Sequence, residues 1–157
     1  MRPGEKVGAM SEARFFNIFD QTTEGTPKWL VEVKRASWRW EMHGIDAFAY
    51  IRSKPTSSGT ETVLVKVPIQ IKSSIAGKAW FARKYSADHV KNIFLFVVEA
   101  TKSDDHLRQA FYSHLGRIRH QGLVFDEFLS RVRRKKFSRQ AEKDVKKKSM
   151  RLRHYKG

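Results

Sequence analysis

The spacing of apolar residues predicts one helix and then three strands in the first half of the chain. Residues 11–20 carry apolar side chains at helical spacing, beginning at a serine that can cap the helix. The stretches 28–37, 43–52 and 61–74 alternate apolar and polar residues, which is the period of a half-buried strand. Residues 54–60, KPTSSGT, are typical of a hairpin loop. We therefore expect three consecutive strands joined by short turns.

The second half of the chain alternates helical patterns with one apolar strand. Residues 76–85 can form a short helix, and residues 92–100, NIFLFVVEA, are apolar on both faces, which predicts a central strand covered on both sides. Residues 103–120 then have helical spacing, with Ser103 as the expected cap and Gly122 as the stop. Three strands followed by a helical crossover give an α/β fold with a central mixed β-sheet flanked by helices.

The length and the composition favour one α/β core with a basic extension. The 157 residues are enough for a single domain. We assign residues 1–123 to the core and residues 124–157 to a basic C-terminal helix and tail, in which a helix begins near Phe125. Two interpretations of the tail stay open. It packs on the core as a helix with a disordered end, or it is an arm that becomes ordered on nucleic acid.

The charge of the chain indicates its class of partner. The formal net charge is +16, and residues 131–157 alone have thirteen Lys and Arg against Glu142 and Asp144, a net of +11. Such an excess attracts polyanions, because binding releases counterions from them. The charge therefore indicates a nucleic-acid partner without indicating an activity.

Two further features exclude classes of protein. The chain has no cysteine, which excludes disulfides, thiolate metal sites and a cysteine nucleophile. The N-terminal residues lack the apolar segment of a signal peptide, and the longest apolar run, residues 93–98, is too short to span a bilayer. We expect a cytoplasmic protein that has no membrane partner.

Polar residues of two predicted strands are the candidates for chemistry. Gln70 and Lys72 lie on one face of their strand, and Ile69 and Ile71 lie on the other. Asp46 occupies the corresponding side of the preceding strand. If the two strands pair, a carboxylate, an amide oxygen and an ammonium group converge at one edge of the sheet. Oxygen ligands of this kind suit Mg²⁺.

The order of the elements and three short motifs resemble the PD-(D/E)XK nuclease superfamily. The motifs are Glu12 on the first helix, Gly44-Ile45-Asp46, and Gln70-Ile71-Lys72 followed by two serines. The resemblance covers roughly residues 8–100. Most members have Glu or Asp where Gln70 stands, and the glutamine form is similar to that of a group I intron homing endonuclease subgroup. An amide in place of a carboxylate removes one charge, so we expect weaker metal binding than in the acidic members.

The resemblance implies a restriction-endonuclease-like core and a Mg²⁺- or Mn²⁺-dependent endonuclease that hydrolyses DNA, of the homing or the restriction/repair type. It implies catalytic roles for Glu12, Asp46, Gln70 and Lys72, with Asp46, Gln70 and the Ile71 carbonyl as metal ligands. Cutting both strands usually needs two active sites, so we expect a homodimer on double-stranded DNA, with residues 103–120 as one candidate surface. The alternatives are a catalytically inactive nucleic-acid-binding protein that keeps the nuclease fold, and a basic ribosome- or RNA-associated protein.

Other polar and aromatic residues have a less specific meaning. Trp38 and Trp40 are expected on one strand face, where core packing is the default and base stacking the minority interpretation. The stretch VEVKR, residues 31–35, has the same Glu-any-Lys form but precedes Asp46, so we interpret it as a charged strand face. The candidate phosphate contacts are Lys78, Arg83, Lys84, Arg133, Arg134, Lys135 and Lys136.

Overall fold

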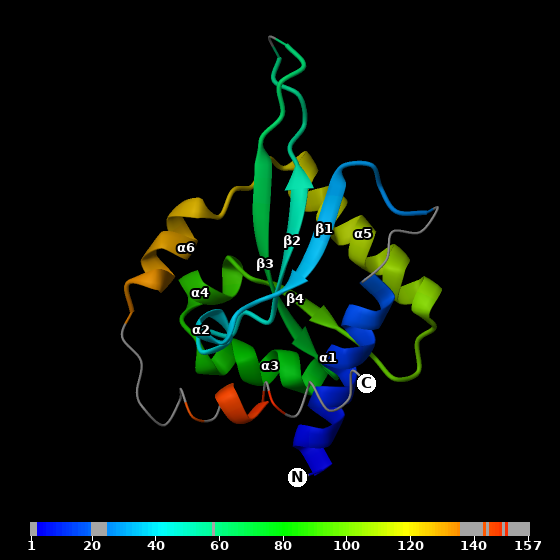
Figure 1. The fold of residues 1–157 in the computed structure, drawn as a ribbon, viewed down its shortest axis with the longest axis vertical. Coiled ribbons are helices and arrows are strands. Elements are labelled where there is room, and N and C mark those ends of the chain that lie inside the picture. The colour runs from blue at the N-terminus through cyan, green and yellow to red at the C-terminus, as the bar shows by residue number, and fades with distance from the viewer. Residues whose placement is uncertain are drawn as a thin grey trace.

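A four-stranded β-sheet stands at the centre of the computed structural model (Figure 1), which describes residues 3–19, 25–57, 59–135, 143, 145–148 and 150. The strands lie in the order β1-β2-β3-β4, with both β1–β2 and β2–β3 antiparallel and β3–β4 parallel. The predicted mixed sheet and α/β class are therefore confirmed. The strands are β1 (Leu30–Arg35), β2 (Ala47–Arg52), β3 (Leu64–Lys72) and β4 (Phe94–Val97).

Helices pack around this sheet. Two of them, α3 and α4, form the crossover that parallel strands need between β3 and β4. Figure 1 shows α1 and α5 to the right of the strands and α4 and α6 to the left. Among the described helices, none combines the length and the hydropathy needed to cross a bilayer. The helices are α1 (Pro3–Phe19), α2 (Trp38–Glu41), α3 (Ile75–Lys84), α4 (Ala87–Lys91), α5 (Asp104–His120) and α6 (Asp126–Arg133).

Aromatic packing fixes α1 against the sheet. The Phe15 ring of α1 lies with its centroid 5.8 Å from that of Phe96 in β4 and 5.4 Å from that of Phe111 in α5, and all three rings are buried. Aromatic pairs at these separations add to the free energy gained by burying the rings. The direction of α1 is therefore set by the sheet and by α5 together.

Arg14 fixes α1 a second time, through residues that follow β4. Its guanidinium donates to the Asp104 carboxylate at 2.9 and 3.2 Å and to the Glu99 carbonyl at 3.0 Å. These bonds join the middle of α1 to the segment between β4 and α5. Because Glu12 precedes Arg14 by two residues in the same helix, its position relative to the sheet is fixed as well.

Helix α6, at the start of the basic extension, belongs to the same core as the sheet. Phe128, Leu129 and Val132 are buried and lie in the core cluster that also contains the strands. The rings of Phe128 and His89 meet at 5.3 Å, which joins α6 to α4. The beginning of the extension is thus a packed helix, as one of the two interpretations of the tail predicted.

Several predicted boundaries are wrong. Helix α1 begins at Pro3, where proline is tolerated in a first helical turn, so Ser11 is an interior residue and not a cap. Trp38 and Trp40 lie in the helical turn α2, because the chain leaves β1 after Arg35 and turns back towards β2. β4 is an edge strand in the described sheet, and it is apolar on both faces because helices cover it there.

Other local predictions are confirmed. The Ser103 hydroxyl accepts a hydrogen bond from the His106 amide at 3.1 Å and caps α5, and Gly122 follows that helix with a φ of +66°. The β2–β3 register runs through Pro68 without a shift. Pairing with β4 begins only at Ile69, so the missing proline amide removes no donor from that ladder.

Gly44 forms the turn that leads from α2 to Asp46. Its φ of +79° lies in the left-handed region. This conformation is unfavourable for any L-residue that has a side chain. A Cβ atom at this position would also lie 2.8 Å from Cε2 of Phe81 and 3.0 Å from Cζ of Tyr85. Only glycine satisfies both conditions, so the Gly-Ile-Asp motif has a structural reason for its first residue.

We predict that Gly44→Ala destabilises the protein by about 3 kcal/mol, from backbone strain plus displacement of the buried Phe81 ring. Gly122→Ala is the matched control, because its φ is also positive but no atom lies within 4 Å of the added Cβ. It should cost only about 1 kcal/mol. Urea unfolding monitored by circular dichroism measures both. Equal losses in the two variants would show that the Phe81 contact has no effect.

Candidate metal centre

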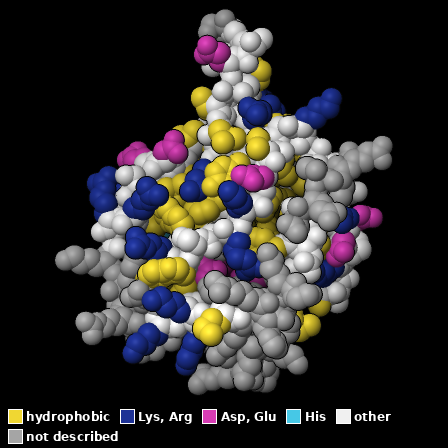
Figure 2. Space-filling view, viewed as in Figure 1, with side chains coloured by type: hydrophobic (Ala, Val, Ile, Leu, Met, Phe, Trp, Pro, Cys, Tyr) yellow, Lys and Arg dark blue, Asp and Glu magenta, His cyan; other side chains and the backbone are white. Residues whose placement is uncertain are grey.

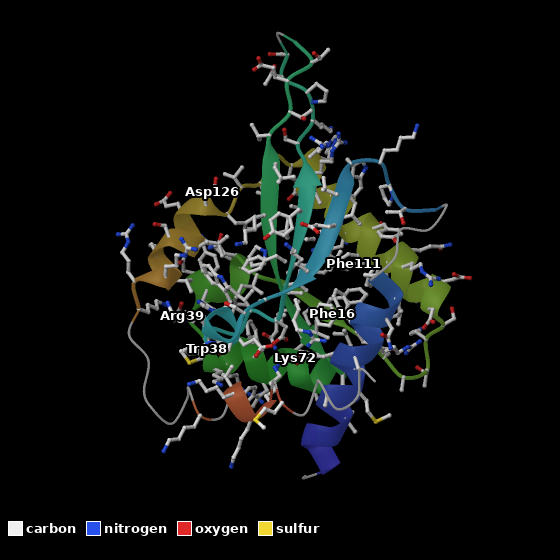
Figure 3. The ribbon with its side chains drawn as sticks, viewed as in Figure 1. Phe16, Trp38, Arg39, Lys72, Phe111 and Asp126 are labelled. Atoms are coloured by element: carbon white, nitrogen blue, oxygen red, sulfur yellow. The ribbon has the colours of Figure 1, made fainter. Side chains whose placement is uncertain are left out.

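Three of the four sequence-predicted catalytic residues meet in one cavity at the end of the sheet. Asp46, Gln70 and Lys72 all line a cavity of about 200 Å³. Figure 3 labels Lys72 near the lower end of the strands, between α2 and α1. The convergence expected from the two-residue period of the strands is therefore present, although Asp46 lies one residue before β2 begins.

Backbone groups of β3 orient Asp46. Its amide donates to the Ile69 carbonyl at 2.8 Å, and its Oδ2 accepts from the Ile71 amide at 3.0 Å. The residue is only 1% exposed. Because one carboxylate oxygen is held by the strand, the other is presented to the cavity in a fixed direction. This contact uses the Ile71 amide, and the predicted role of the Ile71 carbonyl as a ligand stays a prediction.

Three buried carboxylates gather around Asp46, and two of them, those of Glu41 and Asp46, line the cavity. Glu12 of α1, Glu41 of α2 and Asp46 each offer an oxygen, and these oxygens all lie within 4.8 Å of one another. Glu12 and Glu41 are 3% and 7% exposed. Like charges at such separations disfavour one another unless a cation balances them. The geometry therefore favours a bound proton or a cation at this point.

Glu41 is a site residue that sequence reasoning missed. It belongs to no motif, and its distance of five residues from Asp46 fits neither the helical nor the strand period. It reaches the cavity only because α2 is a single helical turn that ends at the Gly44 corner. No pattern of apolar residues predicts such a turn.

Burial dominates the electrostatics of Glu12. Burial and the neighbouring Asp46 charge raise the pKa of Glu12 from its ordinary 4.5 to about 8, although Lys148 acts in the opposite direction. The Arg35 guanidinium lies 4.0 Å from Glu12 Oε2 and is stacked at 4.0 Å over the Phe16 ring. A further cation beside Glu12 would therefore lower its pKa and favour the ionised carboxylate.

Lys148 places an ammonium group between the carboxylates. Its Nζ lies 2.7 Å from Glu12 Oε1 and 3.0 Å from Asp46 Oδ1. Burial lowers the pKa of Lys148, but the Asp46 and Glu12 charges act more strongly, so the net shift is upward. The sequence gives no sign of this role, because Lys148 is one of thirteen basic residues in the C-terminal 27.

Gln70 contributes an oxygen that has no partner. Its Oε1 is buried and accepts no hydrogen bond within the described part of the chain, and the residue is 5% exposed. An unsatisfied buried amide oxygen costs about 1–3 kcal/mol. Together with the Glu12, Glu41 and Asp46 carboxylates it gives an all-oxygen donor set, which is what Mg²⁺ and Mn²⁺ prefer. The residues present therefore fit a hard divalent cation.

Lys72 lies at the same cavity beside aromatic rings. Its Nζ is 5.4 Å from the centroid of Trp80 and 5.7 Å from that of Phe81. Burial lowers the pKa of Lys72, and the Asp46 charge opposes this only in part. An amine with a lowered pKa holds its proton less firmly at neutral pH than an ordinary lysine does.

The predicted phosphate contacts differ in their distance from the site. Lys84 lines the metal cavity itself, and Arg133 lines a second cavity beside α2. Lys78 lies near His114 of α5, whose pKa is lowered by burial first and by Arg117 and Lys78 next. Lys136 lies outside the described residues. Arg83, Arg134 and Lys135 are exposed.

The second Glu-any-Lys triplet is a solvated strand face. The Glu32 and Lys34 side chains lie on β1 with their charged atoms 3.8 Å apart, and they are 48% and 64% exposed. Neither lines the metal cavity. The two triplets thus have the same sequence form, and burial distinguishes them.

We compared the chain with known protein families, curated proteins and solved structures. No family model, curated protein or solved structure matches the chain. The argument for a function therefore rests on the cavity and its residues.

We predict that Lys148 and a divalent cation compete for the same carboxylates. Lys148→Met should destabilise the metal-free protein by about 1–3 kcal/mol, less than for a fully buried pair because the Lys148 side chain is 38% exposed. Mn²⁺ should then raise the melting temperature of this variant more than that of the wild type, in which the ammonium must first be displaced.

Lys147→Met is the control, since Lys147 is the exposed neighbour in the same segment. It should behave as the wild type in thermal unfolding with and without Mn²⁺. An equal effect of Mn²⁺ on the Lys148→Met variant and the wild type would contradict competition.

Proposed function

We propose that this protein is a Mg²⁺- or Mn²⁺-dependent endonuclease that hydrolyses the phosphodiester bonds of DNA, with a restriction-endonuclease-like core. One observation supports it above the others. In a chain of net charge +16, the buried carboxylates of Glu12 and Asp46 lie beside Glu41, with the unpartnered Gln70 oxygen and the Lys72 amine at the same cavity. Carboxylates, an amide oxygen and an amine around one cavity are the groups that metal-assisted phosphodiester hydrolysis uses.

The proposed roles follow from the positions of the side chains. Asp46 and Gln70, with Glu12 and Glu41 close by, would hold a divalent cation, which would supply neutralising charge and lower the pKa of an attacking water. Asp46 is kept in place by the Ile71 amide. The Lys72 amine holds the nucleophile or balances the charge that develops on the phosphate.

Glu41 accounts for activity in a chain that has glutamine in the third motif. Replacing a carboxylate by Gln70 removes one negative charge from the ligand set. Glu41 places another carboxylate oxygen within 4.8 Å of those of Glu12 and Asp46. We therefore assign to Glu41 the charge that the acidic residue of the motif supplies in other members.

The surface around the cavity suits a polyanion. Lys and Arg side chains lie among hydrophobic side chains over much of the face in Figure 2. Lys84 lines the cavity, and Lys78 and Arg83 extend the positive charge along α3. We propose these residues, with Arg133, Arg134 and Lys135, as phosphate contacts, and a homodimer as the arrangement that would bring two such sites to one DNA.

One observation favours the second candidate, an inactive nucleic-acid-binding protein. Lys148 forms ion pairs with both Glu12 and Asp46, as an internal cation would in a protein that has given up metal binding. The two candidates differ in the dependence of DNA cleavage on a divalent metal.

We predict that the protein nicks supercoiled plasmid in Mg²⁺ and that Lys72→Ala lowers the rate about 100-fold or more, since it removes a charge aimed at the reacting phosphate. Lys34→Ala is the matched control, because Lys34 occupies the same position in the exposed triplet. It should leave the rate within about twofold, as surface changes usually leave the protein intact.

Circular dichroism establishes that each variant is folded. Nicking that persists in EDTA, or in Lys72→Ala at the wild-type rate, would contradict the proposed function. A folded wild type that binds plasmid but never nicks it in Mg²⁺ or Mn²⁺ would favour the inactive candidate.

A further inference from the structure

A second and larger cavity lies next to the metal centre and shares α2 with it. Its volume is about 550 Å³, and its lining includes Trp38, Arg39 and Trp40 of α2 with Arg133 of α6. The same turn of α2 ends at Glu41, which lines the metal cavity. Trp38 and Glu41 are three residues apart in a helix, so their Cβ atoms are close neighbours. Figure 3 shows Trp38 and Arg39 to the left of Lys72.

The two tryptophan rings of this cavity lie close to positively charged side chains. The Arg39 guanidinium lies 5.6 Å from the Trp38 ring centroid and the Lys146 amine lies 5.0 Å from it. The Arg133 guanidinium lies 5.6 Å from the Trp40 centroid. An aromatic platform beside several cations is the arrangement that stacks a nucleobase and neutralises its flanking phosphates.

Helix α2, which carries Trp38 and Trp40, is held against the sheet by an aromatic contact. The Trp40 ring meets Phe48 of β2 edge to face at 5.4 Å, and Phe48 is buried. Trp38 and Trp40 are only partly buried, so they are not ordinary core residues. The Trp40–Phe48 contact holds α2, the turn that also carries Trp38, against the sheet, so less of the site has to become ordered when a base binds.

A third tryptophan stands at the metal cavity itself. Trp80 is 50% exposed, and the Lys72 and Lys84 amines lie 5.4 and 4.9 Å from its ring centroid. An exposed indole beside two amines is a surface on which a base can stack and its phosphates can be neutralised. Aromatic rings beside lysine or arginine are therefore present at both neighbouring cavities.

We propose that the DNA strand at the metal centre is unpaired, with one nucleobase stacked on Trp38 in the α2 cavity and its phosphates held by Arg39 and Arg133. The inference rests on the proposed function in taking DNA as the substrate of the metal centre. Bases inside a duplex have both faces covered by their neighbours, so they cannot stack on a protein ring without leaving the helix. Single strands, overhangs and unpaired positions present their bases freely.

The test measures binding in EDTA, where no cleavage occurs. Fluorescence anisotropy compares a labelled single strand, its duplex, and the duplex with a single-stranded overhang, all at one salt concentration, since salt changes the affinity. The single strand and the overhang should bind at least about tenfold tighter than the duplex. Trp38→Leu should weaken single-strand binding about tenfold, the loss expected for one stacked base, and leave duplex binding unchanged.

Trp29→Leu is the matched control. Trp29 is another partly buried tryptophan with an arginine near its ring, Arg119 at 5.6 Å, but it packs against α5. This variant should keep the wild-type affinities. Tryptophan fluorescence on adding the single strand is a second measurement, which a folding defect would not imitate. The single strand should quench the fluorescence of the wild type more than that of Trp38→Phe.

The outcomes separate this inference from the proposed function. Equal affinity of the wild type for duplex and single strand, or an unchanged single-strand affinity in Trp38→Leu, overturns the unpaired-strand inference even if Mg²⁺-dependent nicking is observed. Tighter binding of single-stranded RNA than of DNA with the same sequence overturns it too. Trp38-dependent single-strand binding without any cleavage in Mg²⁺ supports the stacking site and contradicts the nuclease.

Discussion

The repulsion between buried carboxylates is the constraint on which the site depends. Glu12, Glu41 and Asp46 come from three separate segments, and their oxygens lie within 4.8 Å of one another. Such a buried group needs either a bound proton or a cation, because each charge has lost its water. Lys148 provides a positive charge in this structure, and the proposed enzyme would bind a divalent metal ion there. The raised pKa of Glu12 follows from burial first and from the same repulsion second.

The fold brings these groups together by ordinary packing. Phenylalanine rings fix α1 against β4 and α5, which places Glu12. The glycine corner at Gly44 and the β3 backbone place Asp46, and the alternation along β3 turns Gln70 and Lys72 to the same cavity. Each contact stabilises the structure and also positions a side chain of the site. The chemistry proposed here thus depends on packing at some distance from the reacting groups.

Much of this arrangement could be predicted from the sequence, and the rest could not for physical reasons. Strand alternation and motif order predict that Asp46, Gln70 and Lys72 converge, because a two-residue period fixes which side chains share a face. Glu41 could not be found, since α2 is one turn long and shorter than any periodic signal. Lys148 could not be found either, because its ion pairs depend on how the C-terminal segment folds back, and its neighbours in sequence are equally basic.

Locating a bound cation tests the central claim most directly. Crystals grown with Mn²⁺ and measured for anomalous scattering should show a peak at about 2.0–2.2 Å from Asp46 and Gln70 oxygens. Lys148 Nζ should have moved away from Glu12 and Asp46. A structure in saturating Mn²⁺ that keeps both Lys148 ion pairs and shows no peak at these oxygens would contradict the account.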